Sequence, residues 1–232
     1  MKGRIFAIVF LSVTISSLNS MAQSLRNINS DVYHGDYENL SRKLSYNDIK
    51  GSPYLNEDLI LSRVYFKNKD SAEYYLRYDV YADEIEYLKD NRLFTILNMA
   101  TLDYIILNGQ KIVYQTYYFD GKESKGYLVE LVNNKCSLYK RYRVEFEDAQ
   151  PGQSMPFREA SPARFKPIQE QWFFTNEASP ITHFMPNSTG LRQVSDEHYD
   201  KLKAYAKANK LKTKKEDDLV TLFEYYDELL EQ

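Results

Sequence analysis

The stretch from residue 59 to residue 146 carries the pattern that most limits how this chain can fold. Tyr, Val, Ile, Phe and Leu recur there in short runs, and 14 of the 21 tyrosines lie between Tyr54 and Tyr142. Aromatic and β-branched side chains favour strands because they suit a pleated, half-buried surface. The pattern therefore predicts consecutive short strands joined by tight turns. The turn-forming sequences between the runs are Asn68-Lys69-Asp70, Asp90-Asn91, Asn108-Gly109, Asp120-Gly121 and Asn133-Asn134.

Two hairpins stand out within this stretch. Residues 104–107 and 111–114 flank Asn108-Gly109, a dipeptide that tolerates the positive φ angles of a two-residue hairpin turn. Residues 129–132 and 136–144 flank Asn133-Asn134 in the same way. In the last of these strands, alternation predicts that one face carries Cys136, Leu138, Lys140 and Tyr142, and the other Ser137, Tyr139, Arg141 and Arg143.

These features predict an α+β protein whose antiparallel β domain spans residues 53–147. About seven or eight strands are expected in a meander, and a sheet of that size twists too strongly to stay flat. The meander should therefore curl into a sandwich or an open barrel. Residues 23–52 are polar and have no clear period, so we expect them to form an irregular lead-in to this domain.

Prolines mark the next boundary, since six of the seven in the chain fall between residues 151 and 186. Proline lacks the amide hydrogen that a central strand needs. Residues 148–193 are therefore expected to form an extended connector. The apolar island Trp172-Phe173-Phe174 within it is expected to pack back onto the β domain. The six prolines are Pro151, Pro156, Pro162, Pro167, Pro180 and Pro186.

Residues 194–232 show the spacing of apolar residues that is typical of helices, and they predict a helical hairpin at the C-terminus. Ser195 is expected to cap the first helix, and Thr213 with Glu216 resembles a capping box for the second. The hairpin should pack on the sheet or form a lid over it. The first helix would bury Tyr199, Leu202, Tyr205 and Ala206, and the second Leu219, Leu222, Phe223, Tyr226 and Leu230.

The first 22 residues have the layout of a cleaved secretory signal peptide. Two basic residues, Lys2 and Arg4, precede an apolar run over residues 5–18, and small residues stand at Ser20 and Ala22. The run is too short to cross a membrane comfortably, because a spanning helix needs about 20 apolar residues. We therefore expect cleavage after Ala22, no transmembrane segment in the mature chain, and a periplasmic or secreted location.

Composition narrows the setting further. Cys136 is the only cysteine, so the chain contains no internal disulfide, which is more typical of a bacterial periplasm than of an animal extracellular space. Without the two basic residues of the signal, the chain has 28 basic and 33 acidic residues and a net charge of −5. Nucleic-acid binding depends on clustered Lys and Arg, so we expect no nucleic-acid partner.

Recognisable motifs for catalysis, cofactors and metals are missing from the sequence, so no catalytic residue, cofactor or metal site is predicted. The densest acidic cluster is formed by Asp83, Glu84 and Glu86. Two of these carboxylates could act as the acid and base of a glycosidase if the fold brought them close to Asp103 or Asp120. Carboxylates on one strand face more often lie in water or pair with lysines such as Lys89, and we favour that interpretation.

Two further candidates have simpler explanations. Cys136 could form a nucleophile pair with His183 or His198, but a lone cysteine in a strand is usually a small buried side chain. The basic residues from Lys140 to Arg143 could contact nucleic acid, but cross-strand packing against tyrosine accounts for them equally well. The high tyrosine content is the one compositional hint of binding, although tyrosine is also a common residue of half-buried strands.

Three segments resemble a group of exported, β-rich proteins of gram-negative bacteria. The resemblance supplies no activity and no functional residues, and it implies an envelope location only. The segments are Leu76-Arg77-Tyr78-Asp79-Val80-Tyr81 with Asp83-Glu84-Ile85-Glu86-Tyr87, Ser137-Leu138-Tyr139-Lys140-Arg141-Tyr142, and Lys214-Lys215-Glu216-Asp217-Asp218-Leu219 with Glu224-Tyr225-Tyr226.

The sequence thus favours a non-enzymatic exported protein that binds a protein or glycan of the cell envelope. A first alternative is a periplasmic carrier of a lipid or another apolar ligand, with the curved sheet as a cup and the helices as a lid. A second alternative is a hydrolase that uses the carboxylates around Asp83. The ligand-binding residues and the oligomeric state are left open.

Overall fold

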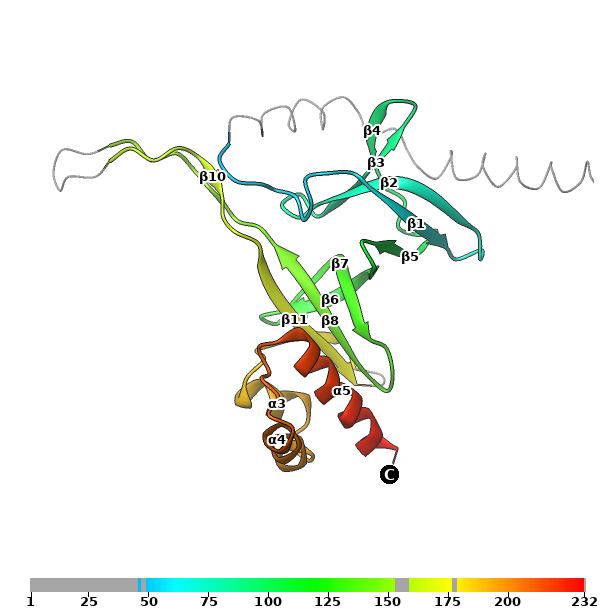
Figure 1. Ribbon diagram of the computed structural model, residues 1–232, viewed down its shortest axis with the longest axis vertical. Helices are drawn as coiled ribbons and strands as arrows, with labels where there is room; N and C mark the ends of the chain where they lie inside the picture. The colour runs from blue at the N-terminus through cyan, green and yellow to red at the C-terminus, as the bar shows by residue number, and fades with distance from the viewer. Residues whose placement is uncertain (1–45, 47–48, 153–158, 177–178, 232) are drawn as a thin grey trace, which may run out of the picture.

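The computed structural model describes residues 46, 49–152, 159–176 and 179–231. The expected signal peptide and most of the expected lead-in lie outside these residues. The described part is elongated, with three helices at one end, an open sheet at the other, and a two-stranded arm that projects from the side (Figure 1). Twelve strands are present in the described residues, more than the seven or eight expected.

The first eight strands form two four-stranded meanders rather than the single meander expected, because the fifth strand pairs with the first and not with the fourth. Their bounds are β1 (Ile60–Phe66), β2 (Ser71–Asp79), β3 (Glu84–Lys89), β4 (Arg92–Thr95), β5 (Leu102–Leu107), β6 (Gln110–Phe119), β7 (Lys122–Val132) and β8 (Cys136–Arg143). The later elements are β9 (Phe146–Glu147), β10 (Arg164–Phe165), β11 (Gln169–Asn176), β12 (Ile181–Phe184), α3 (Ser188–Val194), α4 (Tyr199–Ala208) and α5 (Glu216–Leu230).

Ten of the strands form one sheet in the order β12-β11-β8-β7-β6-β5-β1-β2-β3-β4. Strand β12 also pairs with β6 in parallel, through Ile181 opposite Tyr117 and Thr182 opposite Tyr118. This pairing closes β6, β7, β8, β11 and β12 into a five-stranded barrel, and the other five strands continue as an open extension. The expected sandwich or open barrel is therefore a closed barrel with extra strands. The short strands β9 and β10 form the base of the arm.

The expected proline-rich connector is in part a component of the barrel. Strand β11 runs through the middle of that stretch and pairs along its length with β8. Pro167 precedes this strand, and Pro180 and Pro186 flank β12, so none of the described prolines occupies a central strand position. These three prolines lie just outside the ends of strands, where no backbone amide hydrogen is needed to pair with a neighbouring strand.

The barrel interior is filled by buried side chains from β6, β7, β8 and β11, and the partly buried Ile181 of β12 packs against them. Val113, Tyr117, Leu128, Tyr139 and Phe173 form this buried cluster, and the rings of Tyr117 and Phe173 meet edge to face with centroids 5.0 Å apart. Such filling is expected, because a small barrel has room for its own side chains only. Two larger buried clusters lie outside the barrel, one under the helices and one beneath the open extension.

The alternation predicted for β8 is confirmed. Cys136 and Leu138 lie in the cluster under the helices, whereas Tyr139 lies inside the barrel. The apolar island at Trp172-Phe173-Phe174 belongs to β11, and its side chains also alternate between the two faces of the strand. Phe173 points into the barrel, and its two neighbours contact the helical side.

The C-terminal helices differ from the expected hairpin in two ways. Helix α3 precedes the other two, and its seven residues are too few for a clear periodic signal. Ser195 ends α3 and accepts a hydrogen bond from the His198 amide at 3.1 Å, while α4 begins only at Tyr199. The expected capping box is also wrong, because the Thr213 hydroxyl donates to the Pro186 carbonyl instead.

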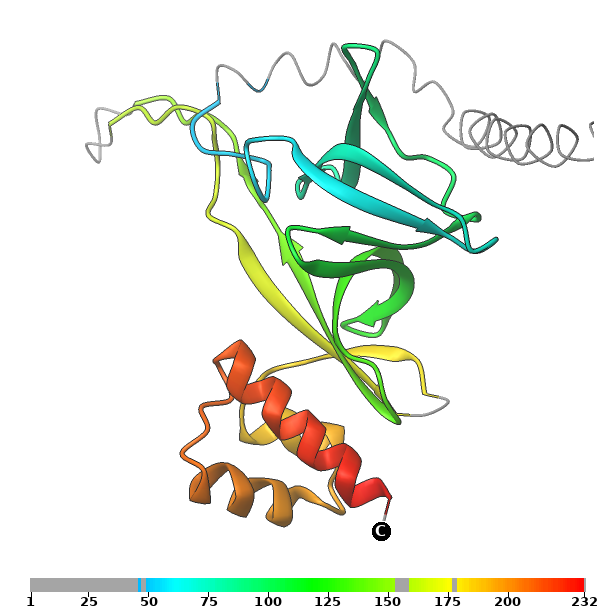
Figure 2. The ribbon, with the colours of Figure 1, turned by 45° about the vertical axis from the view of Figure 1, so that its right-hand side comes forward.

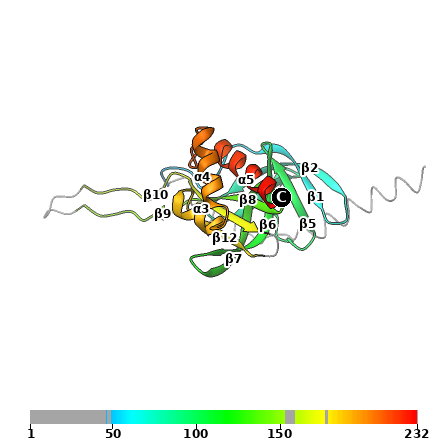
Figure 3. The ribbon, with the colours of Figure 1, turned by 90° about the horizontal axis from the view of Figure 1, so that it is seen from below.

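Helix α5 covers the outer surface of the barrel (Figures 2 and 3). It packs on β7 and β8, and α3 packs on β11 and β12. The predicted apolar stripe is largely confirmed, with Leu229 buried more deeply than Leu230. The buried stripe residues are Leu219, Leu222, Phe223 and Tyr226.

The backbone angles confirm the two predicted Asn-Gly and Asp-Gly turns, whereas Asn133 and Asn134 are not among the residues with positive φ. Asn108 and Gly109 have φ angles of 50° and 77°, and Asp120 and Gly121 have angles of 48° and 74°. Positive φ at both central residues is the conformation that matches the twist of a β-hairpin. These turns place β5 beside β6 and β6 beside β7, as predicted.

A polar contact joins the open extension to the barrel. The Asp83 carboxylate accepts a hydrogen bond from the Tyr78 hydroxyl at 2.5 Å and pairs with Arg141 of the barrel strand β8 at 3.2 Å. Asp83 adopts a φ angle of 56° at the β2–β3 turn, and Gly126 of β7 leaves the space that its carboxylate occupies. A Cβ atom at Gly126 would overlap the Asp83 Oδ2.

We therefore expect Gly126→Ala to destabilise the protein by about 1–3 kcal/mol, the usual cost of overpacking a filled site. Urea unfolding of the variant would measure this loss. In an Asp83→Gly background the same substitution should cost at least about 1 kcal/mol less, because the overlapping carboxylate is gone. Equal costs in both backgrounds would contradict the contact.

Candidate functional site

The most distinctive surface in the described residues is an apolar row across three neighbouring strands. We use the term apolar row for Leu61 of β1, Tyr75 of β2 and Leu88 of β3. Their exposed fractions are 56%, 52% and 36%. Seven large hydrophobic side chains of the described residues are exposed, and these three lie next to one another. Isolated exposed apolar residues are ordinary, whereas these three form a contiguous patch.

Strand register places the row. Leu61 is directly opposite Tyr75, and Tyr75 is directly opposite Leu88. Residues that face each other across antiparallel strands project to the same side with Cβ atoms about 5 Å apart. The row continues to Leu93 of β4, which is opposite Leu88 and half-buried.

Ion pairs frame the row on both sides. Arg63 pairs with Glu73 at 2.5 Å across β1 and β2, and both side chains are about half exposed. On the other side Arg77 pairs with Glu86 at 2.7 Å, and the Glu86 side chain is fully buried. The surface therefore has an apolar centre and a charged border.

Tyrosine rings lie beyond the ion pairs on both sides of the row. The Arg77 guanidinium lies 3.7 Å from the ring centroid of Tyr54. Burial, together with the nearby Glu86, raises the pKa of Tyr54 to about 12, so its hydroxyl stays protonated and neutral. Beyond the first ion pair, Tyr65 and Tyr104 stack with centroids 4.3 Å apart.

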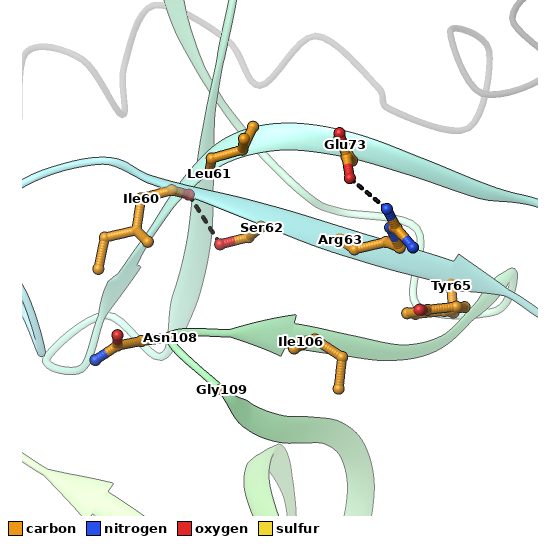
Figure 4. Close-up of a pocket in the computed structure, with 9 residues that line it drawn as sticks. All are labelled: Ile60, Leu61, Ser62, Arg63, Tyr65, Glu73, Ile106, Asn108 and Gly109. Atoms are coloured by element: carbon orange, nitrogen blue, oxygen red, sulfur yellow. Dashed lines mark hydrogen bonds and ion pairs between the residues drawn. The ribbon is translucent and has the colours of Figure 1, made fainter.

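A shallow hollow of about 470 Å³ adjoins the row (Figure 4). It lies where β1 and the β5–β6 turn diverge, because pairing between β1 and β5 is limited to residues 63–66 of β1. Ser62 and Asn108 face the hollow from opposite sides, and the Ser62 hydroxyl donates to the Ile60 carbonyl at 2.8 Å.

The acidic cluster singled out in the sequence is divided between the two faces of the sheet. Asp83 contacts Tyr78, whereas Glu86 contacts Arg77, and successive strand residues point to opposite faces. Glu84 accepts a hydrogen bond from Thr95 at 3.4 Å. The two other carboxylates of that hypothesis, Asp103 and Asp120, are exposed on β5 and in the β6–β7 turn.

Cys136 lies in the core, away from a catalytic arrangement. Its thiol is fully buried under α5, and burial, with a smaller contribution from Asp227, raises its pKa to about 12. The His183 ring packs against Phe119 with centroids 4.5 Å apart, and His198 Nδ1 lies 3.2 Å from the Ser195 hydroxyl. Burial lowers the pKa of His183, which keeps its imidazole neutral.

The basic residues of β8 are each paired with a carboxylate. Lys140 is buried and bonds to Glu216 of α5, with Glu170 at 3.5 Å. Burial alone would lower the pKa of Lys140, but the hydrogen bonds to Glu216 and Tyr142 outweigh it and raise the pKa overall. Arg141 pairs with Asp83, so these charges hold elements together rather than face a ligand.

Groups of three or more His, Cys, Asp or Glu side chains suited to a metal ion do not occur among the described residues. Within the same residues, each helix is too short or too polar to cross a membrane.

The apolar row was not predicted, because alternation assigns a residue to a face but the register that aligns three strands is not visible in the sequence.

The buried thiol leads to a direct test. In the folded protein we expect Cys136 to react with a thiol-specific reagent at about pH 8 roughly a thousandfold more slowly than in the unfolded chain, because the raised pKa keeps it protonated. Absorbance of the released reagent before and after adding guanidinium chloride measures the two rates. Similar rates would contradict a buried, protonated thiol.

Comparisons with protein-family models, with curated proteins and with solved structures found no match to this chain. Any inference about its function therefore rests on the residues and contacts described above.

Proposed function

We propose that this protein is an exported binding module of the cell envelope that engages a protein partner through the apolar row. The observation that carries the proposal is the alignment of Leu61, Tyr75 and Leu88 on a solvent-exposed sheet face. Binding through such a face needs no catalytic group, which agrees with a non-enzymatic role.

The composition of the face favours a protein partner over a glycan. Protein interfaces combine an apolar, aromatic centre with a polar rim, and tyrosine is enriched among the residues that contribute most to binding. Tyr75 lies at the centre, and the pair of Arg63 and Glu73 lies at the rim. A sugar usually stacks on a free aromatic face, but Tyr65 and Tyr104 cover each other.

The alternatives have less support from the geometry. Tyr117, Tyr139 and Phe173 occupy the barrel interior that a lipid carrier would need for its ligand. For a hydrolase, the carboxylates near Asp83 are engaged with Tyr78 and Arg141 rather than exposed in a cleft.

Site-specific photo-crosslinking in cells tests the proposed contact surface. A photoreactive phenylalanine analogue at Tyr75 should give one discrete crosslinked protein, because this side chain lies at the centre of the row. The same analogue at Tyr81 is the matched control, since Tyr81 is 44% exposed but lies outside the row. Mass spectrometry of the adduct identifies the partner, and an adduct with a second copy of the chain would be recognised by its mass.

A substitution in the apolar row tests whether the adduct at Tyr75 depends on binding through that row. Leu61→Glu should reduce the adduct at Tyr75 by about tenfold or more, because a buried charge at an interface costs at least about 1–2 kcal/mol. Leu97→Glu, at another exposed leucine, should leave the adduct unchanged. Equal adducts at Tyr75 and Tyr81, or insensitivity to Leu61→Glu, would contradict the proposal.

The proposed export has its own test. In a gram-negative host, the protein recovered outside the cytoplasm should begin at Gln23, because Ser20 and Ala22 fit the small-residue sites of a signal peptidase. Replacing Ala22 by the bulky residue tyrosine should block cleavage, and intact mass measures the retained segment. An unprocessed chain confined to the cytoplasm would contradict export.

A further inference from the structure

A run of exposed lysines gives α4 and the connection to α5 a strong positive charge. Residues 199–215 contain seven lysines and a single acidic residue, Asp200. All seven lysines are exposed, and none of them forms an ion pair with another described residue. We call this surface the lysine corner; it comprises Lys201, Lys203, Lys207, Lys210, Lys212, Lys214 and Lys215.

The lysine corner makes the molecule electrically asymmetric. The whole chain has a net charge of −3, and the segment 199–215 carries +6, so the rest of the chain carries −9. The acids that follow in sequence are partly engaged, since Glu216 pairs with Lys140 and Asp218 accepts a hydrogen bond from the Lys212 amide at 2.8 Å. Asp200 and Asp217 are the exposed acids of this region. An asymmetry of this kind orients a protein toward an anionic surface.

The connection between α4 and α5 holds the lysines in place. The Leu211 amide donates to the Ala206 carbonyl at 2.8 Å, and the Thr213 hydroxyl donates to the Pro186 carbonyl at 2.7 Å. In Figure 2, α4 lies at the lower end of the molecule, and the connection runs up beside it to α5. The lysines thus project from an ordered, outward-facing end, far from the open extension that carries the apolar row (Figure 1).

We propose that the lysine corner docks this protein on an anionic lipid surface. Lysine is a compact point charge that suits diffuse attraction, whereas arginine is preferred where phosphates are recognised in paired hydrogen bonds. Residues 199–232 contain no arginine. Basic segments beside a membrane use this kind of attraction, which strengthens with each added lysine.

The aromatic residues nearby favour a lipid surface over single-stranded nucleic acid. Such nucleic acids bind by stacking their bases on exposed aromatic rings. Tyr205 and Tyr225 stack on each other with centroids 3.8 Å apart and nearly parallel planes, so each covers a face of the other. The Tyr199 ring is flanked by Arg192, whose guanidinium lies 3.9 Å from its centroid.

Vesicle sedimentation with the full chain tests this proposal. The protein should bind vesicles with about 30% phosphatidylglycerol and lose that binding in high salt, because salt screens the attraction. Lys207→Gln/Lys214→Gln should weaken binding by about 30-fold, from about fivefold per lysine. The matched control is Lys122→Gln/Lys125→Gln, which makes the same change in net charge at exposed lysines of β7. Its binding should change by less than about threefold.

Phosphatidylcholine vesicles measure any binding by the apolar residues 5–18, which does not depend on lipid charge. Equal binding to both kinds of vesicle would overturn the proposal, as would equal effects of the two double variants. Tighter binding to a short DNA duplex or to polyglutamate than to the anionic vesicles at the same salt would also overturn it, and would assign the corner to another polyanion.

Discussion

The parallel pairing of β12 with β6 is the contact on which the rest of the structure depends. Two residue pairs, Ile181 with Tyr117 and Thr182 with Tyr118, turn a long open sheet into a closed barrel. Closure buries the aromatic cluster inside the barrel and creates the curved outer surface on which α3 and α5 pack. Without it, β12 would be an edge strand paired only with β11, and the surface under α3 and α5 would not be closed.

The Asp83 contact provides the second connection. The open extension is continuous with the barrel through β5 and β6, and Asp83 adds a link between the β2–β3 turn and β8. Because Gly126 provides the space for that carboxylate, one small residue in the barrel determines how closely the extension approaches it. The apolar row on the extension and the lysine corner on the helices are thereby held at opposite ends of one body (Figure 1).

Local sequence signals predicted the local structure well. Positive φ angles at Asn108-Gly109 and Asp120-Gly121 match their turn chemistry, and the faces of β8 follow simple alternation. Contacts between residues distant in the chain could not be predicted. The parallel β12–β6 pair and the register of the apolar row depend on tertiary packing, which no local pattern encodes.

At the helical end, a capping box predicted from local sequence is replaced by contacts with residues distant in the chain. Thr213 and Glu216 have the spacing of a capping box, yet their side chains bond to the Pro186 carbonyl between β12 and α3 and to Lys140 of the barrel strand β8. The run of lysines in the lysine corner can be read from the sequence, and the structure adds that these lysines are exposed at one ordered end and form no ion pair with another described residue.

Barrel closure also limits how this sheet can grow. The β12–β6 pairing occupies one edge of the ten-stranded sheet. Among the described residues, β4 is the terminal strand at the other edge, and it is four residues long. A ladder with a single free end can join one other such end, after which both are occupied. Association through the β4 edge of the described ten-stranded sheet would therefore stop at two copies, whereas a sheet with two free edges permits continued stacking.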